Sequence, residues 1–210
     1  MTAPAKLIIF LKAPRVGFVK TRLAKTLGAR AATEAYRQLV ENLLEALASL
    51  ENVQLRFSPD DAAEEITSWR QPSWEIAPQG AGDLGQRLIN AFQSAFDSGA
   101  QHVVIIGSDC PAITLRDIQE AWGALPAQDL VLGPARDGGY WLIALRSPQP
   151  QLFRDMGWST ETVLTETLRR ARASGLTVHL LRELSDVDTD ADWKEFLTSQ
   201  RQSRLTDLPA

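Results

Sequence analysis

Short apolar runs with the composition of β-strands alternate with longer segments of helical periodicity along most of this chain. The runs lie at residues 6–12, 53–57, 74–78, 102–107, 129–133, 140–146 and 176–184. Most of the segments between them repeat apolar residues every three or four positions, as a helix with one buried face does. This alternation predicts an α/β fold in which a mostly parallel sheet carries helices on both faces.

The expected sheet is mixed, because the runs at 129–133 and 140–146 are adjacent and can pair in antiparallel fashion. Helices are expected over about 21–50, 61–69, from Asp83, from Thr114, over 159–173 and over 190–199. No repeat, linker or boundary interrupts the pattern. We therefore expect one domain over residues 1–200, followed by a polar tail at 201–210 that frays.

Charge is distributed unevenly along the sequence. Residues 1–33 carry seven Lys and Arg residues and no acid, whereas the whole chain has a net charge of -4. This indicates a local anion site rather than nucleic-acid binding, for which the overall balance is usually basic.

Cysteine, histidine and long apolar segments are scarce, which excludes several classes of protein. One cysteine, Cys110, and two histidines exclude an intrachain disulfide, a thiolate zinc cage and a His-rich metal site. No apolar run approaches the roughly 20 residues of a membrane helix. The N-terminal run is also too short for the core of a signal peptide, so we expect a cytoplasmic protein.

The early basic residues surround a glycine in the turn after the first apolar run. Lys12, Arg15, Lys20 and Arg22 flank Gly17. A glycine there lets backbone amides approach an anion, a helix N-terminus adds a favourable dipole, and arginine can bind phosphate through two N–H groups. The spacing is not that of a Walker A loop. We expect this loop to bind phosphate; the alternative is a solvated helix face that is basic by chance.

A second glycine-rich turn, residues 80–85, has the pattern G-x-G-x-x-G. It follows the third strand rather than the first, and Asp83 would place a negative charge beside a pyrophosphate, so a Rossmann site is disfavoured. The remaining interpretations are a structural turn in which Asp83 caps a helix, or a loop in which Asp83 contacts the base or ribose of a nucleotide.

Aspartates follow two other strands. Asp109 comes just after the 102–107 run, and the acidic segment 186–190 follows the last run and could supply a second carboxylate. Hard carboxylate oxygens in these positions suit Mg²⁺ or Mn²⁺ held against a diphosphate. Each also has a structural alternative: Asp109 could cap a helix or close a turn, and the later segment could cap the last helix through Asp190.

The loop between the paired runs contains Asp137, Gly138, Gly139 and Tyr140. It fits a plain hairpin turn and a ligand loop equally well: in the second case Asp137 accepts a proton or binds a sugar hydroxyl. The expected acceptor pocket comprises Gly138, Gly139, Tyr140 and Trp158. Core packing is the alternative for Trp158.

Four motifs together resemble one family: FLKAPRVGFVKTRLA, GSDCP, LGPARDGGYWLI and a W-S-T segment before a helix, with DVDT near the end. Over residues 6–197 the chain resembles bacterial nucleotide-diphospho-sugar transferases of GT-A type, including selenodomain-associated and arsenosugar-type glycosyltransferases. It is more distantly similar to molybdenum-cofactor and phospholactate nucleotidyltransferases.

The resemblance implies a GT-A domain with nucleotide near the first loop and a divalent cation on Asp109. In the nucleotidyltransferase relatives a second acidic residue shares the metal, and Asp188 matches it best. Many glycosyltransferases of this fold have Asp-x-Asp where this chain has one carboxylate, at Asp109.

These observations favour a metal-dependent glycosyltransferase that uses a nucleoside-diphosphate sugar and a small-molecule acceptor, with no nucleic acid and no membrane span. Lys20 and Arg22 are expected to hold phosphates. Asp109 and Asp188 are expected to hold Mg²⁺ or Mn²⁺, and Asp137 to position or deprotonate the acceptor. The alternatives are a nucleotidyltransferase that takes a nucleoside triphosphate and releases pyrophosphate, and a non-catalytic nucleotide-binding module. The base, sugar, acceptor and oligomeric state stay open.

Overall fold

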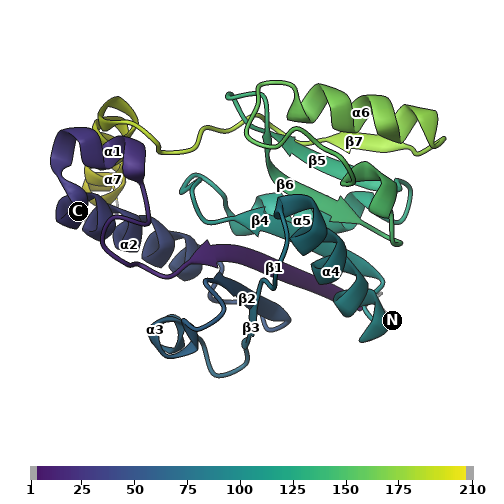
Figure 1. Ribbon diagram of the computed structural model, residues 1–210, viewed down its shortest axis with the longest axis horizontal. Helices are drawn as coiled ribbons and strands as arrows, with labels where there is room; N and C mark the ends of the chain where they lie inside the picture. The colour runs from purple at the N-terminus through teal and green to yellow at the C-terminus, as the bar shows by residue number, and fades with distance from the viewer. Residues whose placement is uncertain (1–3, 207–210) are drawn as a thin grey trace.

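Seven strands form one sheet in the order β3-β2-β1-β4-β6-β5-β7 (Figure 1). The computed structural model describes residues 4–206, and side chains as far as residue 200. The strands are β1 (Ala5–Lys12), β2 (Val53–Ser58), β3 (Glu75–Pro78), β4 (His102–Gly107), β5 (Leu130–Pro134), β6 (Tyr140–Leu145) and β7 (Val178–Leu180). The helices are α1 (Thr21–Leu27), α2 (Ala29–Ala46), α3 (Ala63–Thr67), α4 (Leu84–Asp97), α5 (Leu115–Ala124), α6 (Val163–Ala173) and α7 (Asp190–Thr206), with a 3₁₀ turn η1 (Pro150–Leu152).

All neighbouring strands are parallel except β6, which runs antiparallel to both β4 and β5. The β5–β6 pair is the antiparallel pair expected from the two adjacent runs. The predicted mixed, mostly parallel α/β sheet is thus confirmed.

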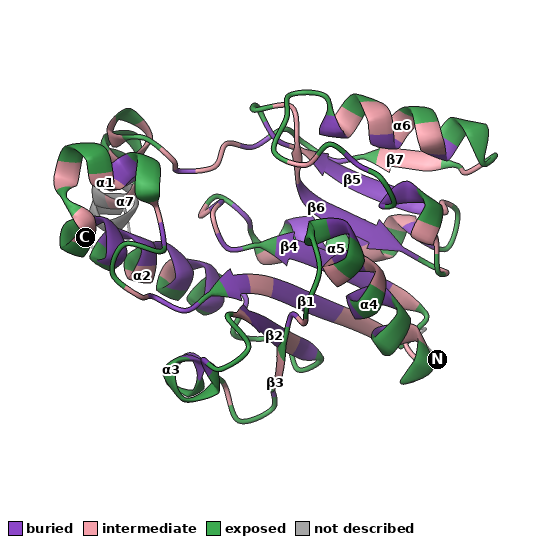
Figure 2. Ribbon diagram, in the orientation of Figure 1, coloured by how far each residue is buried: buried purple, intermediate pink, exposed green. Residues whose placement is uncertain are grey.

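Both faces of the sheet are covered, because its central strands are apolar on both sides (Figure 2). In β1, Leu7, Ile9 and Leu11 face a core shared with α2, α3 and α5, whereas Ile8 faces a second core shared with α4, η1 and α6. This is the pattern of a strand buried on both faces.

The helix expected over 21–50 is two helices in the structure. Gly28 separates α1 from α2 with φ 83° and ψ 154°, a conformation that residues with a β-carbon rarely adopt. The break turns α1 away from the line of α2 and places the first turn of α1 beyond the carboxyl end of β1 (Figure 1).

The last strand is shorter than expected. The 176–184 run forms a strand only at β7, and the chain then leaves the sheet edge and crosses toward α1 and α7 (Figure 1). Helix α7 continues to Thr206, beyond the predicted end near 199. The rest of the predicted tail, 207–210, lies outside the described residues.

Helix α7 packs beside α1 and α2 at one end of the sheet (Figure 1). Trp193 lies against the small apolar cluster of Leu23, Ala32 and Ala35, and Phe196 packs with Leu39. These contacts anchor both chain segments that approach the carboxyl end of β1. No helix within residues 4–206 has the length and apolar character needed to cross a membrane.

Candidate functional site

The segment after β7 runs across the carboxyl ends of several strands. Backbone hydrogen bonds fix its path: the N–H of Leu184 donates to the carbonyl of Pro134 at 3.0 Å, and that of Val187 donates to the carbonyl of Asp109 at 3.0 Å. The segment therefore delivers the carboxylates of residues 186 and 188 to the loop that follows β4.

Lys20 is the centre of an ionic cluster at this edge. Its Nζ lies 2.6 Å from Oδ1 of Asp109 and 3.3 Å from Oδ1 of Asp188, and its side chain is only 3% exposed. Arg22 adds a longer contact, 3.5 Å from its Nη1 to the other carboxylate oxygen of Asp188. The structure thus brings the basic first loop and both predicted metal ligands together.

Burial and charge act in opposite directions on the ionisable groups of this cluster. Burial disfavours the charged form of Lys20, but the carboxylates of Asp109 and Asp188 outweigh it and raise the lysine pKa. Burial, together with the nearby charges of Asp109, Asp137 and Asp188, raises the pKa of Asp186 to about 7. Negative charge is therefore crowded here, with Lys20 as its buried counter-ion.

Tyr36, on α2, fixes the position of the two strand ends. Its Oη accepts the backbone N–H of Lys12 at 2.8 Å and lies 3.1 Å from both the carbonyl oxygen of Lys12 and Oγ of Ser108. The hydroxyl is buried, and burial raises its pKa. Sequence reasoning assigned Tyr36 only to the apolar face of a helix. The one signal of its role was a tyrosine among aliphatic residues on that face.

In the described part of the chain, the other predicted phosphate-binding residues of the first loop make no hydrogen bond or ion pair with Lys20, Asp109 or Asp188. Gly17 occupies the turn with φ 87°, and the side chain of Lys12 is exposed. Arg15 is bound elsewhere: its guanidinium is 2.7 Å from Glu65 and 3.0 Å from Asp61. Phosphate binding by this loop stays a prediction, with Lys20 and Arg22 as the residues directed at the acidic cluster.

Asp83 caps helix α4. Its Oδ1 accepts the backbone N–H of Gln86 at 2.8 Å. This is the structural interpretation that the sequence left open, and it already satisfies one carboxylate oxygen. A nucleotide contact by Asp83 remains a prediction.

The loop between β5 and β6 combines a turn with tight packing. Oδ1 of Asp137 accepts the backbone N–H of Gly139 at 2.9 Å, and the carbonyl of Gly138 accepts the N–H of Leu164 on α6. The Asp137 side chain is exposed. It therefore holds the turn through one oxygen and faces solvent near the acidic cluster.

Tyr140 and Trp158 pack against the core between the sheet, α4 and α6. Their phenol oxygen and indole nitrogen are both covered. This matches the core-packing alternative for Trp158, so a role of the two rings in an acceptor pocket requires them to turn outward and stays a prediction.

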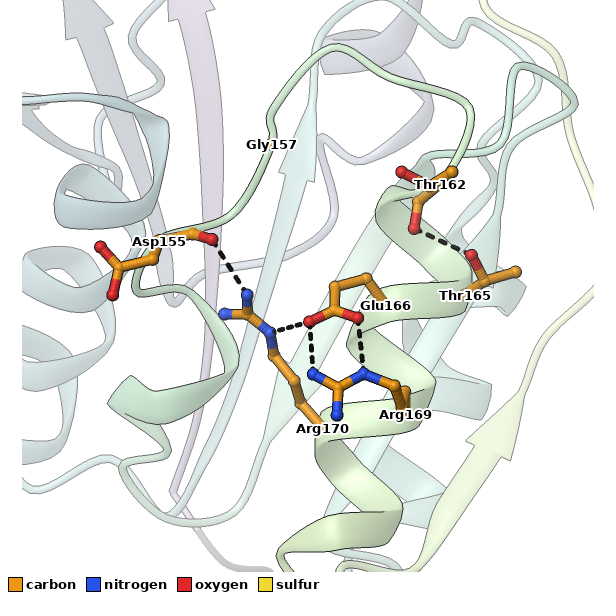
Figure 3. A pocket seen from close by; sticks show the side chains of 7 residues that line it. All are labelled: Asp155, Gly157, Thr162, Thr165, Glu166, Arg169 and Arg170. Carbon is orange, nitrogen blue, oxygen red and sulfur yellow. Dashed lines mark hydrogen bonds and ion pairs between the residues drawn. The ribbon is translucent and has the colours of Figure 1, made fainter.

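A groove of about 420 Å³ lies beside α6, away from α1 in the fold (Figures 1 and 3). Its lining comprises Asp155, Gly157, Thr162, Thr165, Glu166, Arg169 and Arg170. Glu166 binds both arginines, at 2.7 Å each, and these hydrogen bonds hold its pKa near 2. Both arginines of the groove are thus paired with Glu166, and no residue predicted from the sequence belongs to the lining.

The donor set of Asp109 and Asp188 fits a hard divalent cation. Their side chains are 49% and 42% exposed, and one oxygen of each already faces a shared cationic group. Within residues 4–206, no group of three or more His, Cys, Asp or Glu side chains is arranged to hold a metal ion. The pair would therefore supply part of a coordination shell, and Mg²⁺ commonly completes its shell with water and phosphate oxygens.

Comparisons with known proteins find a family model and a solved structure that resemble this chain. A family model described as "Uncharacterized protein conserved in bacteria (DUF2064)" matches residues 43–160. A crystal structure from Desulfovibrio desulfuricans G20, provisionally described as a nucleotide-diphospho-sugar transferase, has a TM-score of 0.84 at 36% identity, covering 89% of this chain and 83% of that one.

Two curated relatives carry the name of an activity. The phosphoenolpyruvate guanylyltransferase of Chloroflexus aggregans is 26% identical over 193 residues, which cover 89% of this chain and 95% of the relative. The 2-phospho-L-lactate guanylyltransferase of Methanocaldococcus jannaschii is 25% identical over 171 residues, which cover 81% and 73%. The similarity therefore extends over most of the chain.

Proposed function

The chain belongs to the bacterial DUF2064 family, and we propose that it is a nucleotidyltransferase that transfers a nucleoside monophosphate from a nucleoside triphosphate to a phosphorylated small molecule. Its named relatives are transferases, so the chain is an enzyme of that class. Two of them are guanylyltransferases, which favours nucleotidyl transfer over the glycosyl transfer expected first from the sequence. The observation that carries the proposal is the contact of Lys20 with both Asp109 and Asp188.

The reaction needs positively charged side chains that bind the triphosphate, and an acceptor that is held in line with the α-phosphorus. An oxygen of the acceptor phosphate attacks the α-phosphorus, the bond between the α-phosphorus and the bridging oxygen breaks, and pyrophosphate leaves with that oxygen. Lys20 and Arg22 hold the β- and γ-phosphates. Asp109 and Asp188 would hold a divalent cation, which would neutralise further charge on the phosphates.

Asp137 acquires a different task in this reaction than in sugar transfer. A phosphate monoester is largely dianionic at neutral pH and already a nucleophile, so no proton has to be removed. Asp137 would then position the acceptor loop through its bond to Gly139. A sugar or alcohol acceptor, in contrast, needs a base at this position.

The test uses the purified full chain with Mg²⁺, each ribonucleoside triphosphate in turn, and phosphoenolpyruvate or 2-phospholactate as acceptor. Release of pyrophosphate, with an acceptor–nucleotide product detected by mass spectrometry, is expected for one of the triphosphates. Asp137→Asn is expected to keep most of that activity, because Asn can retain the turn. Turnover that disappears in Asp137→Asn would contradict a phosphate nucleophile.

Glycosyl transfer is the second candidate, favoured by the 36%-identical structure described as a nucleotide-diphospho-sugar transferase. Its mark is release of a nucleoside diphosphate from a nucleotide sugar, without pyrophosphate. Tight nucleotide binding with no product from either donor class would instead indicate the non-catalytic module.

A further inference from the structure

Lys20 occupies the space between the two carboxylates that are predicted to bind a cation. Its Nζ contacts Oδ1 of Asp109 at 2.6 Å and Oδ1 of Asp188 at 3.3 Å. The lysine side chain is almost completely buried, whereas both aspartates are about half exposed. The ammonium group therefore lies on the protein side of the pair.

An ammonium group and a divalent cation that contact the same carboxylate oxygens repel each other strongly. A magnesium or manganese ion requires oxygens at about 2.1 Å and repels a positive nitrogen held against them. Any cation that binds Asp109 and Asp188 together must first displace Lys20, or share the oxygens at a cost in Coulomb energy.

The backbone conformation of Lys20 is a second observation that its side chain is held between the two aspartates. Lys20 has φ 46° and ψ 46°, a left-handed conformation that is strained for a residue with a β-carbon. It is also the N-cap of α1, and its carbonyl accepts the N–H of Ala24 at 2.8 Å. The ion pairs therefore hold the lysine inward despite the strained backbone.

Removal of the ammonium would leave uncompensated negative charge. Lys20 contacts the carboxylates of both Asp109 and Asp188. The remaining basic side chain of the cluster, Arg22, is 74% exposed and reaches only Asp188. A cation has a strong electrostatic reason to enter once Lys20 leaves.

We propose that Lys20 keeps the Asp109–Asp188 pair closed to divalent cations until a polyphosphate draws its ammonium group away, so that nucleotide and cation bind cooperatively. The identity of the polyphosphate as a nucleoside triphosphate rests on the proposed function. Competition between Lys20 and the cation rests on the geometry alone. Cooperativity of this kind is reciprocal: the polyphosphate and the cation raise each other's affinity by the same factor.

The test measures binding of Mn²⁺ alone, by the loss of the free-ion paramagnetic resonance signal, in the absence of nucleotide. Lys20→Met removes the charge and keeps the length of the side chain. We expect Lys20→Met to bind Mn²⁺ about tenfold or more tightly than the parent protein. Lys25→Met is the matched control, because Lys25 is an exposed lysine of α1 and its loss changes the net charge equally. It should leave Mn²⁺ affinity within about twofold of the parent.

Two further variants secure the interpretation. Lys20→Gly also removes the ammonium and relieves the left-handed backbone, so it tests the same point in a chain that folds without that strain. The double variant Lys20→Met/Asp109→Asn should lose the Mn²⁺ affinity gained in Lys20→Met. That loss would assign the ion to the Asp109–Asp188 pair.

Equal Mn²⁺ affinity in the parent, Lys20→Met and Lys20→Gly would overturn the proposal, and so would no binding to either Lys20 variant at millimolar Mn²⁺. Because this test measures no turnover, failure of the proposed function is separate: a tenfold gain of Mn²⁺ affinity in Lys20→Met, together with a parent protein that transfers no nucleotide, would uphold the competition and refute the reaction.

Discussion

The guanidinium of Arg182 binds both carboxylate oxygens of Asp117, each at 2.7 Å, and also donates to the carbonyl of Ala112 at 2.8 Å. Asp117 belongs to the first turn of α5, where it forms a capping box with Thr114. Arg182 belongs to the segment that carries Asp188. This one side chain thus links the loop after β4 to the C-terminal acidic segment.

Loss of this link should destabilise the fold. The Asp117 side chain is only 5% exposed, so Arg182→Ala leaves a buried carboxylate with fewer partners. We expect a loss of about 2 kcal/mol in the free energy of unfolding in urea. Arg169→Ala is the control, because Arg169 pairs with Glu166 on the surface of α6 and should cost no more than about 0.5 kcal/mol. Equal losses in the two variants would contradict the importance of the Arg182 link.

The same pair predicts an acid-sensitive contribution to stability. Burial acts to raise the pKa of Asp117, but the hydrogen bonds from Arg182 and Thr114 outweigh it and hold the pKa below its usual value. The folded chain therefore binds fewer protons than the unfolded chain, so this contribution is complete above the unfolded pKa of about 3.9 and is lost as pH falls toward the folded pKa. The stability difference between the parent and Asp117→Asn should shrink from pH 7 to pH 3 in denaturant titrations. A difference that does not change with pH would refute this assignment.

Gly138 should tolerate no side chain. It has φ 86°, and a β-carbon there would overlap the backbone carbonyl of Glu161. We expect Gly138→Ala to cost about 3 kcal/mol, from the left-handed backbone and the overlap together. Gly175→Ala, at φ 68° with open space around it, should cost only about 1 kcal/mol. Thermal unfolding of both variants gives the comparison, and similar melting temperatures would argue against the overlap.

Asp109 and Asp83 should differ sharply in their effect on turnover. Asp109→Asn removes a charge from the proposed cation site, and we expect kcat/KM for pyrophosphate release to fall about 100-fold, or about 3 kcal/mol. Asp83→Asn preserves the cap on α4, because Asn caps a helix as well as Asp, and should keep activity within about twofold. A large loss in Asp83→Asn would instead support the predicted nucleotide contact.

Much of the fold could be predicted because its elements are marked locally. The runs at 102–107 and 140–146 became β4 and β6 with little change in their bounds, since a strand buried in a sheet must be apolar along its length. The α5 start was visible in Thr114 and Asp117, because a capping box involves residues only three positions apart. The break at Gly28 was missed, since apolar spacing continues through it and a single glycine is compatible with a helix.

The amino-acid sequence by itself determined the succession of strands and helices along the chain, the mixed sheet and the loops that carry polar residues. Each of these features depends on residues that lie only a few positions apart in the sequence. Only the tertiary structure decided which of those polar residues meet. Lys20 and Asp188 are 168 positions apart, and their contact depends on the Gly28 break and on the path of the segment after β7. The same holds for Arg15, which turned to Asp61 and Glu65. Ion pairs between distant residues form only where the packing of the core brings their backbone segments together. The charges of neighbouring residues in the sequence do not determine that packing.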